Sequence, residues 1–425
     1  MEYNKYELDT YNIHTIKTDK FKTVRMEIIF SGDVVKEDMA PYSFLCDLLT
    51  DSSKKYMTRK SIAIRLEELY KTIFYGVTNK VGNVFLSSFV TEFIDPKYIN
   101  EPNYLENVLS FPLEIITNPR VTNEEFDMTS FNIVKKRMLK EVEAIKENPD
   151  KLAINKALSL MDENSPSSFR VLGTTEDILN LTTTNLYPYY EKLLNETNCD
   201  IFVIGNINNK EVVELIKKHF KRKNKQVNKL NFLVNNVVKN EVLQIKEESN
   251  FIQSTLVMIY NINNLDKDKL NIDFHVFNYL FGSGGINALL YKVLRTENSL
   301  CYALRSLYLK YDGLLVVEVS LDKENVDRAK KLIEKCLNDV IEGKFSDNDL
   351  LDAKKNLTLS LKMGLDSNVS LLNNYVFNYY DELPLILERV EEIKIVEKVD
   401  IINCAKALKL NTVYVQDAGD LHERN

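Results

Sequence analysis

Apolar and polar positions in the first half of the chain follow the periods of strands and helices. Runs rich in β-branched and aromatic residues predict strands at 24–30, 71–79, 84–93 and 199–204, with a turn at 80–83. Apolar residues at helical spacing predict helices at 41–50, 61–70, 105–116, 124–146 and 209–220. Strands therefore both precede and follow a group of helices.

The second half repeats this order. Strands are predicted at 254–261, 300–308, 313–321 and 413–415, with a turn at 311–313. Helices are predicted at 270–280, 286–294, 325–342 and 346–363. Asp322 is a residue type that often caps a helix, and Ser346 followed by Asp349 suggests a capping box.

The two halves also match residue by residue. The segment VFLSSFVTEFID at 84–95 is similar to LLVVEVSLDKEN at 314–325, and TNEEFDMTSFNIVKK at 122–136 is similar to SDNDLLDAKKNLTLS at 346–360. Between the halves, residues 221–239 are rich in Lys and Asn and weakly periodic, which predicts a solvated linker. We therefore predict an α+β protein of two homologous domains, 1–222 and 240–425, each a mainly antiparallel sheet packed with helices.

Composition narrows the classes of function. A chain of 425 residues suits two or more domains, and a formal net charge of −7 gives no general attraction to nucleic acid or anionic membranes. The sequence has no apolar run of membrane-spanning length, and residues 1–20 lack the apolar core of a signal peptide, so we expect a cytoplasmic protein. The five cysteines are widely spaced and form no CxxC pair, which favours buried free thiols over disulfides or a zinc ribbon.

A family resemblance rests on several segments of the chain. Residues 281–322 (FGSGGINALLYKVLRTENSLCYALRSLYLKYDGLLVVEVSLD) resemble the second-domain signature of pitrilysin/insulinase-type zinc peptidases, in which an Arg precedes a Leu-x-Tyr motif. Residues 26–38 (MEIIFSGDVVKED) and the helix after them resemble the first domain. Residues 48–70 and 171–194 resemble the inactive partner subunits of Gram-positive bacteria, the YfmF-like proteins. The resemblance spans nearly the whole chain and implies a clam shell of two domains.

The zinc motif of that family is degenerate here. The family motif is HxxEH on a helix, with two His as zinc ligands and the Glu as general base, and a second helix supplies a Glu as third ligand. The matching positions are occupied by Ser43, Cys46 and Asp47, so all three roles are lost. We interpret 43–47 as a plain amphipathic helix.

The other candidate ligands do not rebuild a zinc site. The four histidines all lie more than five residues apart, so none forms a helical pair: His14, His219, His275 and His422. The resemblance places the third-ligand helix at 131–146, where we expect Glu141 and Glu143 to be surface charges. We therefore expect no metal in this chain.

The sequence does contain the Arg and Tyr that, in the family, face the zinc from the second domain. The resemblance implies that Arg295 and Tyr302 bind the substrate backbone and stabilise the oxyanion at the zinc of a separate partner subunit. A guanidinium and a phenol can both donate to a developing negative oxygen. The alternative is that Tyr302 is a core residue of a strand and Arg295 a surface charge.

The densest glycine cluster of the chain is Gly282, Gly284 and Gly285. It has neither a GxGxxG nor a GxxxxGK pattern, so a phosphate loop is not indicated. A turn that opens the helix at 286–294 is one interpretation. The other, implied by the resemblance, is a flexible loop that contacts peptide substrate or the partner.

We therefore predict a non-catalytic subunit of a heterodimeric zinc metallopeptidase, inactive alone, that acts with a homologous zinc-bearing partner in cleaving a peptide or small protein in a bacterial cytoplasm. It would bind no cofactor itself, and its peptide substrate would be held as an added strand. One alternative is a scaffold or peptide-binding protein of the same fold with no role in hydrolysis. Another is an enzyme with unrelated chemistry, which no motif supports.

Overall fold

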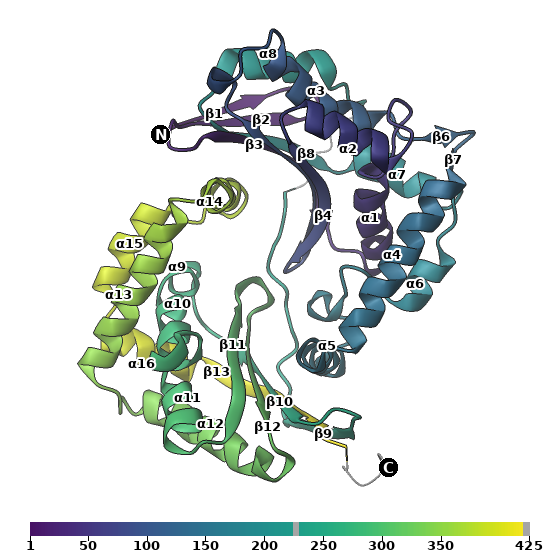
Figure 1. Cartoon of the computed structure of the whole chain (residues 1–425). Helices are drawn as coiled ribbons and strands as arrows, with labels where there is room; N and C mark the ends of the chain where they lie inside the picture. Colours follow the sequence, from purple (N-terminus) through teal and green to yellow (C-terminus); the bar gives the residue numbers. More distant parts are fainter. Residues whose placement is uncertain (224–228, 420–425) are drawn as a thin grey trace. The chain divides into compact units, whose positions relative to one another are not determined.

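Two β-sheets organise the chain in the computed structural model, which describes residues 1–223 and 229–419 (Figure 1). Each sheet lies in one of two compact units. The first unit is formed by Met1–Glu143, Arg170–Phe232 and Asp366–Tyr380, and the second by Ala144–Phe169, Leu233–Leu365 and Asp381–Asn425. The α+β class and the two-domain organisation predicted from the sequence are confirmed.

The first unit contains a mixed six-stranded sheet in the order β1-β2-β8-β3-β5-β4. Only the β2–β8 pair is parallel. The strands are β1 (Glu2–Glu7), β2 (Asn12–Lys17), β3 (Thr23–Asp33), β4 (Ile73–Val81), β5 (Val84–Ile94) and β8 (Asn198–Gly205).

Helices cover both faces of this sheet. Figure 1 shows α3 and α8 on one face and α14 on the other. The helices of this unit are α1 (Lys36–Leu49), α2 (Arg59–Glu68), α3 (Tyr104–Thr117), α4 (Met128–Lys146), α6 (Thr175–Asn180), α7 (Tyr187–Glu196), α8 (Asn209–His219) and α14 (Asn368–Asp381), the last residues of α4 and α14 excepted. A two-residue hairpin, β6 (Val121–Thr122) and β7 (Glu125–Phe126), precedes α4.

The second unit contains a five-stranded sheet in the order β11-β12-β10-β13-β9, in which only β13 and β9 are parallel. The strands are β9 (Leu243–Glu248), β10 (Ser254–Ile262), β11 (Cys301–Leu309), β12 (Leu314–Leu321) and β13 (Leu408–Asp417). The helices are α5 (Pro149–Met161), α9 (Lys267–Asn271), α10 (Asp273–Asn278), α11 (Leu289–Tyr291), α12 (Val326–Ile341), α13 (Asp347–Gly364), α15 (Ile386–Ile395) and α16 (Lys398–Lys406).

Each unit includes a helix from the other half of the sequence. Successive residues of a strand face opposite sides of the sheet, and the residues of β10 from Ser254 to Asn261 are all buried, so both faces need apolar cover. In β10, Leu256 and Met258 join the main core, whereas Val257 and Ile259 pack with residues of α5. Helix α14, from the second half of the sequence, belongs to the first unit. The two compact units therefore do not coincide with the ranges 1–222 and 240–425.

Several predicted elements differ in their bounds. The helix predicted at 41–50 begins at Lys36 and carries Pro41 inside its first turns. The helix predicted at 124–146 begins only at Met128, because Asn123 and Glu124 adopt positive φ at the tip of the β6–β7 hairpin. The segment predicted as one helix at 286–294 is broken into a 3₁₀ turn, the short α11 and a π-helix.

Part of the predicted linker, 224–228, and His422 lie outside the described residues. The rest of 221–239 forms neither helix nor strand. Among the described residues, no helix combines the length and the apolar character that crossing a bilayer requires.

Candidate functional site

The degenerate motif lies on α1, which crosses closely over the edge strand β4. A Cβ atom on Gly76 of β4 would come within 2.5 Å of the carbonyl oxygen of Cys46, so the helix can approach this strand only at a glycine. The thiol of Cys46 is buried against the hydroxyl of Thr78 at 3.3 Å. Burial raises the pKa of Cys46 to about 12, so the residue at the general-base position remains a neutral thiol.

The two former histidine positions are also engaged within the chain. The hydroxyl of Ser43 donates to the carbonyl oxygen of Val171 at 2.6 Å. Asp47 forms an ion pair with Arg137 of α4, at 3.2 and 3.3 Å from two guanidinium nitrogens. Asp51 lies 3.7 Å from the same guanidinium. A positive side chain from α4 is therefore already paired with one carboxylate of α1 and lies near another just after the end of that helix.

These residues do not fit a zinc ion. Zinc requires deprotonated or neutral ligand atoms that point at one centre. Here one candidate is a buried thiol, one is a hydroxyl bonded to the backbone, and the carboxylate of Asp47 is paired with Arg137. Within residues 1–223 and 229–419, no group of three or more His, Cys, Asp or Glu is arranged to hold a metal ion.

Helix α4, the expected third-ligand helix, contributes Arg137 to this cluster. Glu141 and Glu143 are both exposed on it. The pKa of Glu141 is raised, first by burial of part of the carboxyl and then by the negative charge of Asp47, so Glu141 lies within electrostatic range of the former motif. A pocket of about 300 Å³ opens beside the cluster and is lined by Asp47 and Arg137 among others.

Replacing Arg137 by Ala is expected to destabilise the first unit by about 2 kcal/mol at pH 7, between the values for exposed and for buried ion pairs. Burial raises the pKa of Asp51, and Arg137 opposes that rise, so the variant raises this pKa further. A carboxyl with a raised folded-state pKa favours the folded state when protonated. The difference from the wild type should therefore shrink as the pH falls from 7 toward about 4.

Urea unfolding of both proteins at a series of pH values measures this difference. Arg65→Ala is the control, because Arg65 pairs with Glu68 on the exposed face of α2. A stability loss for Arg137→Ala that is the same at pH 7 and pH 4 would contradict the electrostatic role of Arg137.

Arg295 and Tyr302 lie together in the second unit. Arg295 belongs to a π-helical segment, Lys292–Glu297, a rare geometry that often occurs at functional sites. Its guanidinium donates to the backbone carbonyl of Tyr302 at 3.0 Å and stacks over the ring of Tyr291, with 5.4 Å between guanidinium carbon and ring centroid. Arg295 is exposed, which leaves the rest of its donor groups toward solvent.

Tyr302 lies in a β-bulge of the edge strand β11. Cys301 pairs with Leu321 of β12 and Ala303 pairs with Ser320, which leaves Tyr302 as the extra residue between them. A bulge turns a side chain out of the regular alternation, and Tyr302 is 53% exposed. The interpretation of Tyr302 as a core residue is therefore wrong.

Asp322 completes this constellation. The phenol of Tyr302 donates to its carboxylate, with oxygen–oxygen distances of 3.1 and 3.2 Å. This hydrogen bond, followed by the negative charge of Asp322, raises the pKa of Tyr302. The sequence suggested instead that Asp322 caps the next helix, but its side chain makes no capping hydrogen bond.

Two of the three clustered glycines pack tightly against the chain, and the third faces open space. A Cβ on Gly282 would meet Ser306 of β11 at 2.4 Å, and one on Gly284 would meet the carbonyl oxygen of Tyr279 at 2.5 Å. Gly285 has φ of +63° and faces open space. The cluster thus joins the π-helical segment Tyr279–Ser283 to a 3₁₀ turn, close to the strand that carries Tyr302.

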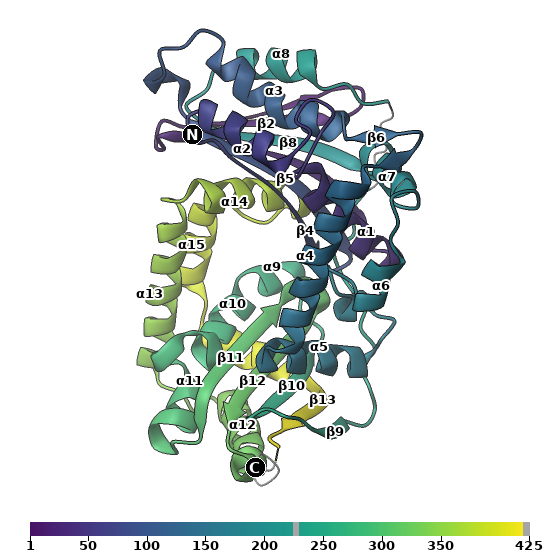
Figure 2. The ribbon, with the colours of Figure 1, turned by 45° about the vertical axis from the view of Figure 1, so that its right-hand side comes forward.

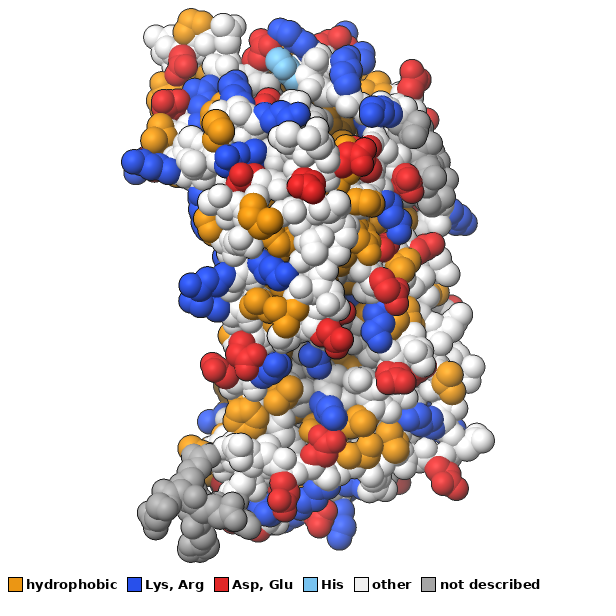
Figure 3. Space-filling view, turned by 90° about the vertical axis from the view of Figure 1, so that its right-hand side faces the viewer, with side chains coloured by type: hydrophobic (Ala, Val, Ile, Leu, Met, Phe, Trp, Pro, Cys, Tyr) orange, Lys and Arg blue, Asp and Glu red, His pale blue; other side chains and the backbone are white. Residues whose placement is uncertain are grey.

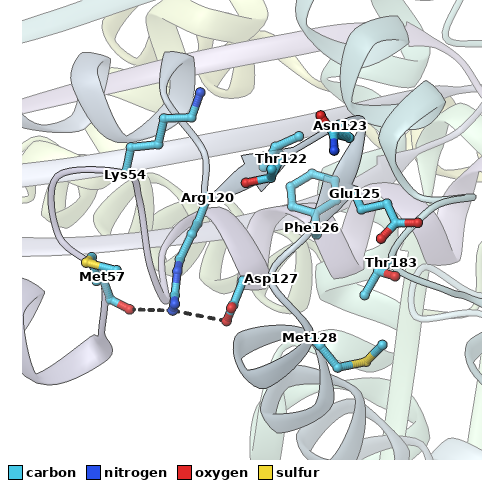
Figure 4. Close-up of a pocket in the computed structure, with 11 residues that line it drawn as sticks. Lys54, Met57, Arg120, Thr122, Asn123, Glu125, Phe126, Asp127, Met128 and Thr183 are labelled. Carbon is cyan, nitrogen blue, oxygen red and sulfur yellow. Dashed lines mark hydrogen bonds and ion pairs between the residues drawn. The ribbon is translucent and has the colours of Figure 1, made fainter.

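A larger pocket, of about 810 Å³, lies in the first unit beside the β6–β7 hairpin (Figure 4). The guanidinium of Arg120 holds its wall by donating to the carbonyl of Met57 and pairing with Asp127, both at 3.0 Å. None of the candidate site residues predicted from the sequence lines this pocket.

On the face drawn in Figure 3, side chains of both charges are interspersed with apolar ones.

Comparison with known proteins agrees with this fold. A family profile described as "Peptidase M16 inactive domain" matches residues 180–357. The "Probable inactive metalloprotease YmfF" of Bacillus subtilis is 25% identical over 409 residues, covering 94% of each chain. An "Uncharacterized zinc protease" of Rickettsia felis is 23% identical over 316 residues, covering 71% of this chain and 72% of that protein.

Solved structures give the same result. A conserved protein from Enterococcus faecalis V583 has a TM-score of 0.91 at 25% identity and covers 98% of this chain and 99% of its own. A peptidase M16 inactive domain from Pseudomonas fluorescens has a TM-score of 0.80 at 15% identity and covers 99% of each chain.

The fold is that of the M16-type structures, and within the described residues no group of His, Cys, Asp or Glu is arranged to hold a metal ion. The predicted resemblance to pitrilysin/insulinase-type (M16) peptidases is confirmed: the chain is similar to the inactive domain of that family over residues 180–357 and to a probable inactive metalloprotease over nearly its whole length. The Bacillus subtilis relative is named YmfF, which corrects the form YfmF.

Proposed function

We propose that this chain is the non-catalytic subunit of a heterodimeric zinc metallopeptidase. It would associate in the cytoplasm with a homologous zinc-bearing subunit, and the pair would cleave a peptide or small protein. The observation that carries the proposal is the exposed Arg295–Tyr302 pair, held by a π-helical segment and a β-bulge in a chain whose own motif helix is closed by internal bonds.

The chemistry of the pair suits an acyl-transfer site. Arg295 keeps donor groups free for solvent, and the phenol of Tyr302 is a second donor on the same surface. Donors arranged in advance around a developing oxyanion stabilise the transition state without reorganisation. In the proposed assembly the partner's zinc would polarise the scissile carbonyl, while Arg295 and Tyr302 would hold its oxygen.

The position of Tyr302 also suits a peptide substrate. β11 is an edge strand of its sheet, and an extended peptide can add to such an edge through backbone hydrogen bonds. Of the glycines at 282, 284 and 285, the first two pack against this chain, and Gly285, which faces open space, would let the turn approach that peptide closely. A scaffold or peptide-binding role without hydrolysis uses the same edge but does not require Arg295 or Tyr302.

The test is to purify this chain with the zinc-bearing M16 homologue of its own organism. We expect a one-to-one complex by analytical ultracentrifugation, and the Tyr302→Phe chain should form that complex equally well. Tyr302→Phe should lower kcat/KM of the complex about tenfold, the effect of losing one hydrogen-bond donor to the reacting oxygen. A complex that cleaves equally well with Tyr302→Phe would favour the scaffold role.

A further inference from the structure

The phenol of Tyr302 has a single proton, and a carboxylate accepts it. The phenol oxygen of Tyr302 lies 3.1 and 3.2 Å from the two carboxylate oxygens of Asp322, so its one proton is directed at this carboxylate. A phenol can donate only one hydrogen bond, although its oxygen can also accept. While Asp322 holds that proton, Tyr302 cannot donate to a substrate oxygen.

The backbone around Tyr302 explains why Asp322 is the acceptor. The bulge places Tyr302 between the pairs Cys301–Leu321 and Ala303–Ser320, so its side chain lies beside the residue that follows Leu321. That residue is Asp322, which follows the last residue of β12 and precedes the 3₁₀ turn Lys323–Asn325. Its carboxylate is available because the backbone of the following 3₁₀ turn closes without a side-chain cap.

We propose that Asp322 is a latch on Tyr302, which holds the phenol in the free chain and releases it only when negative charge develops on the substrate. This inference rests on the proposed function, because it assigns a regulator to the same pair of residues.

The charges of the competing acceptors give the latch its selectivity. A charged carboxylate accepts a stronger hydrogen bond than a neutral peptide carbonyl, so Tyr302 stays with Asp322 when substrate first binds. The oxyanion of the transition state carries a charge similar to that of Asp322 and can compete for the proton. An interaction made in the transition state and withheld from the ground state accelerates the reaction rather than tightening substrate binding.

The first measurement uses the isolated chain and needs no partner. A 3-fluorotyrosine at position 302, followed by ¹⁹F NMR as the pH is raised, reports the pKa of this phenol. The bond to Asp322 raises that pKa, so Asp322→Asn and Asp322→Ala should both lower it. Glu324→Gln is the matched control, because Glu324 affects Tyr302 only through a smaller charge effect and should change the titration less.

An unchanged titration in both Asp322 variants would overturn the latch, since the hydrogen bond would then be absent in solution. Folding is not expected to interfere. The backbone bond from the N–H of Asn325 to the carbonyl of Asp322 does not involve the side chain, and the asparagine variant keeps the shape of the residue.

The second measurement uses the assembled peptidase pair. Without the latch, the phenol is free to bind the ground-state carbonyl, so Asp322→Ala should lower KM by roughly two- to tenfold, the usual range for one hydrogen bond, without raising kcat. A fall in kcat with KM unchanged would overturn the latch, because Asp322 would then only position the ring.

The two proposals can fail separately. If Tyr302→Phe leaves cleavage by the pair unchanged, the proposed function of Tyr302 fails, whatever the NMR titration shows. If Tyr302→Phe impairs cleavage but Asp322→Ala changes neither the titration nor KM, the proposed function stands and the latch is wrong.

Discussion

Replacing Arg295 by Ala lowers kcat/KM of the assembled peptidase pair by about 10²- to 10³-fold, the cost of removing one charged donor from an oxyanion site. The guanidinium is the positively charged donor of the proposed site, whereas Tyr302 donates through a neutral phenol. Steady-state cleavage of a fluorogenic peptide by the pair gives the value.

The variant needs two companions, because Arg295 also bonds to the carbonyl of Tyr302. Arg295→Lys keeps the charge but loses the planar fork of donors, so it should recover only part of the activity. Arg328→Ala removes an exposed arginine of the same unit, which bonds to Asn298, and should leave cleavage unchanged. Equal activity of the Arg295→Ala and Arg328→Ala pairs would contradict a role for Arg295 at the reacting oxygen.

Replacing Asp200 by Ala destabilises the first unit by about 3 kcal/mol or more, because several buried donors lose one shared acceptor. Asp200 accepts from the amide of Asn12 and the phenol of Tyr380, both at 2.8 Å, and from His14 at 3.2 Å. Burial lowers the pKa of His14, so its neutral ring donates to Asp200 and accepts from the phenol of Tyr3.

This loss should appear first at α14, which reaches the sheet through Tyr380. Hydrogen–deuterium exchange of the α14 amides should accelerate in Asp200→Ala together with the fall in the urea midpoint. Asp19→Ala is the control, because Asp19 is exposed on the loop after β2. Protection of α14 that matches the wild type would show that Asp200 does not anchor this helix.

The sequence could not predict that α5 belongs to the second unit and α14 to the first. Periodicity identifies a strand that needs cover on both faces, as the fully buried β10 does. It does not say which helix supplies that cover, because a chain segment far away in sequence can bury the same apolar area. The tyrosines of α14 pack on His14 and Phe202, contacts that no local pattern encodes.

Residue spacing in the sequence predicted part of the candidate site. The interval from Arg295 to Tyr302 suggested two members of the candidate site, and the structure places them in contact. Asp322 was identified only as a capping residue, because local propensity favours that role for an Asp before a helix. The β-bulge at Tyr302, which redirects the phenol to Asp322, has no composition signal and appears only in the strand register.

For the degenerate zinc motif, too, the sequence showed one part and only the structure showed the rest. The loss of the motif was visible at Ser43, Cys46 and Asp47 in the sequence. The ion pair between Asp47 and Arg137 was not, since Arg137 lies 90 residues from Asp47 and no pattern links them. Ion pairs between distant helices depend on how those helices pack.

The most direct test of the central claim is peptide cleavage by this chain alone, by its zinc-bearing homologue alone and by the two mixed, with zinc measured in each. We expect zinc only in the homologue, no cleavage by this chain alone, and activity of the mixture at least tenfold above that of the homologue. Stoichiometric zinc in this chain, or a homologue that gains nothing from its addition, would contradict the claim.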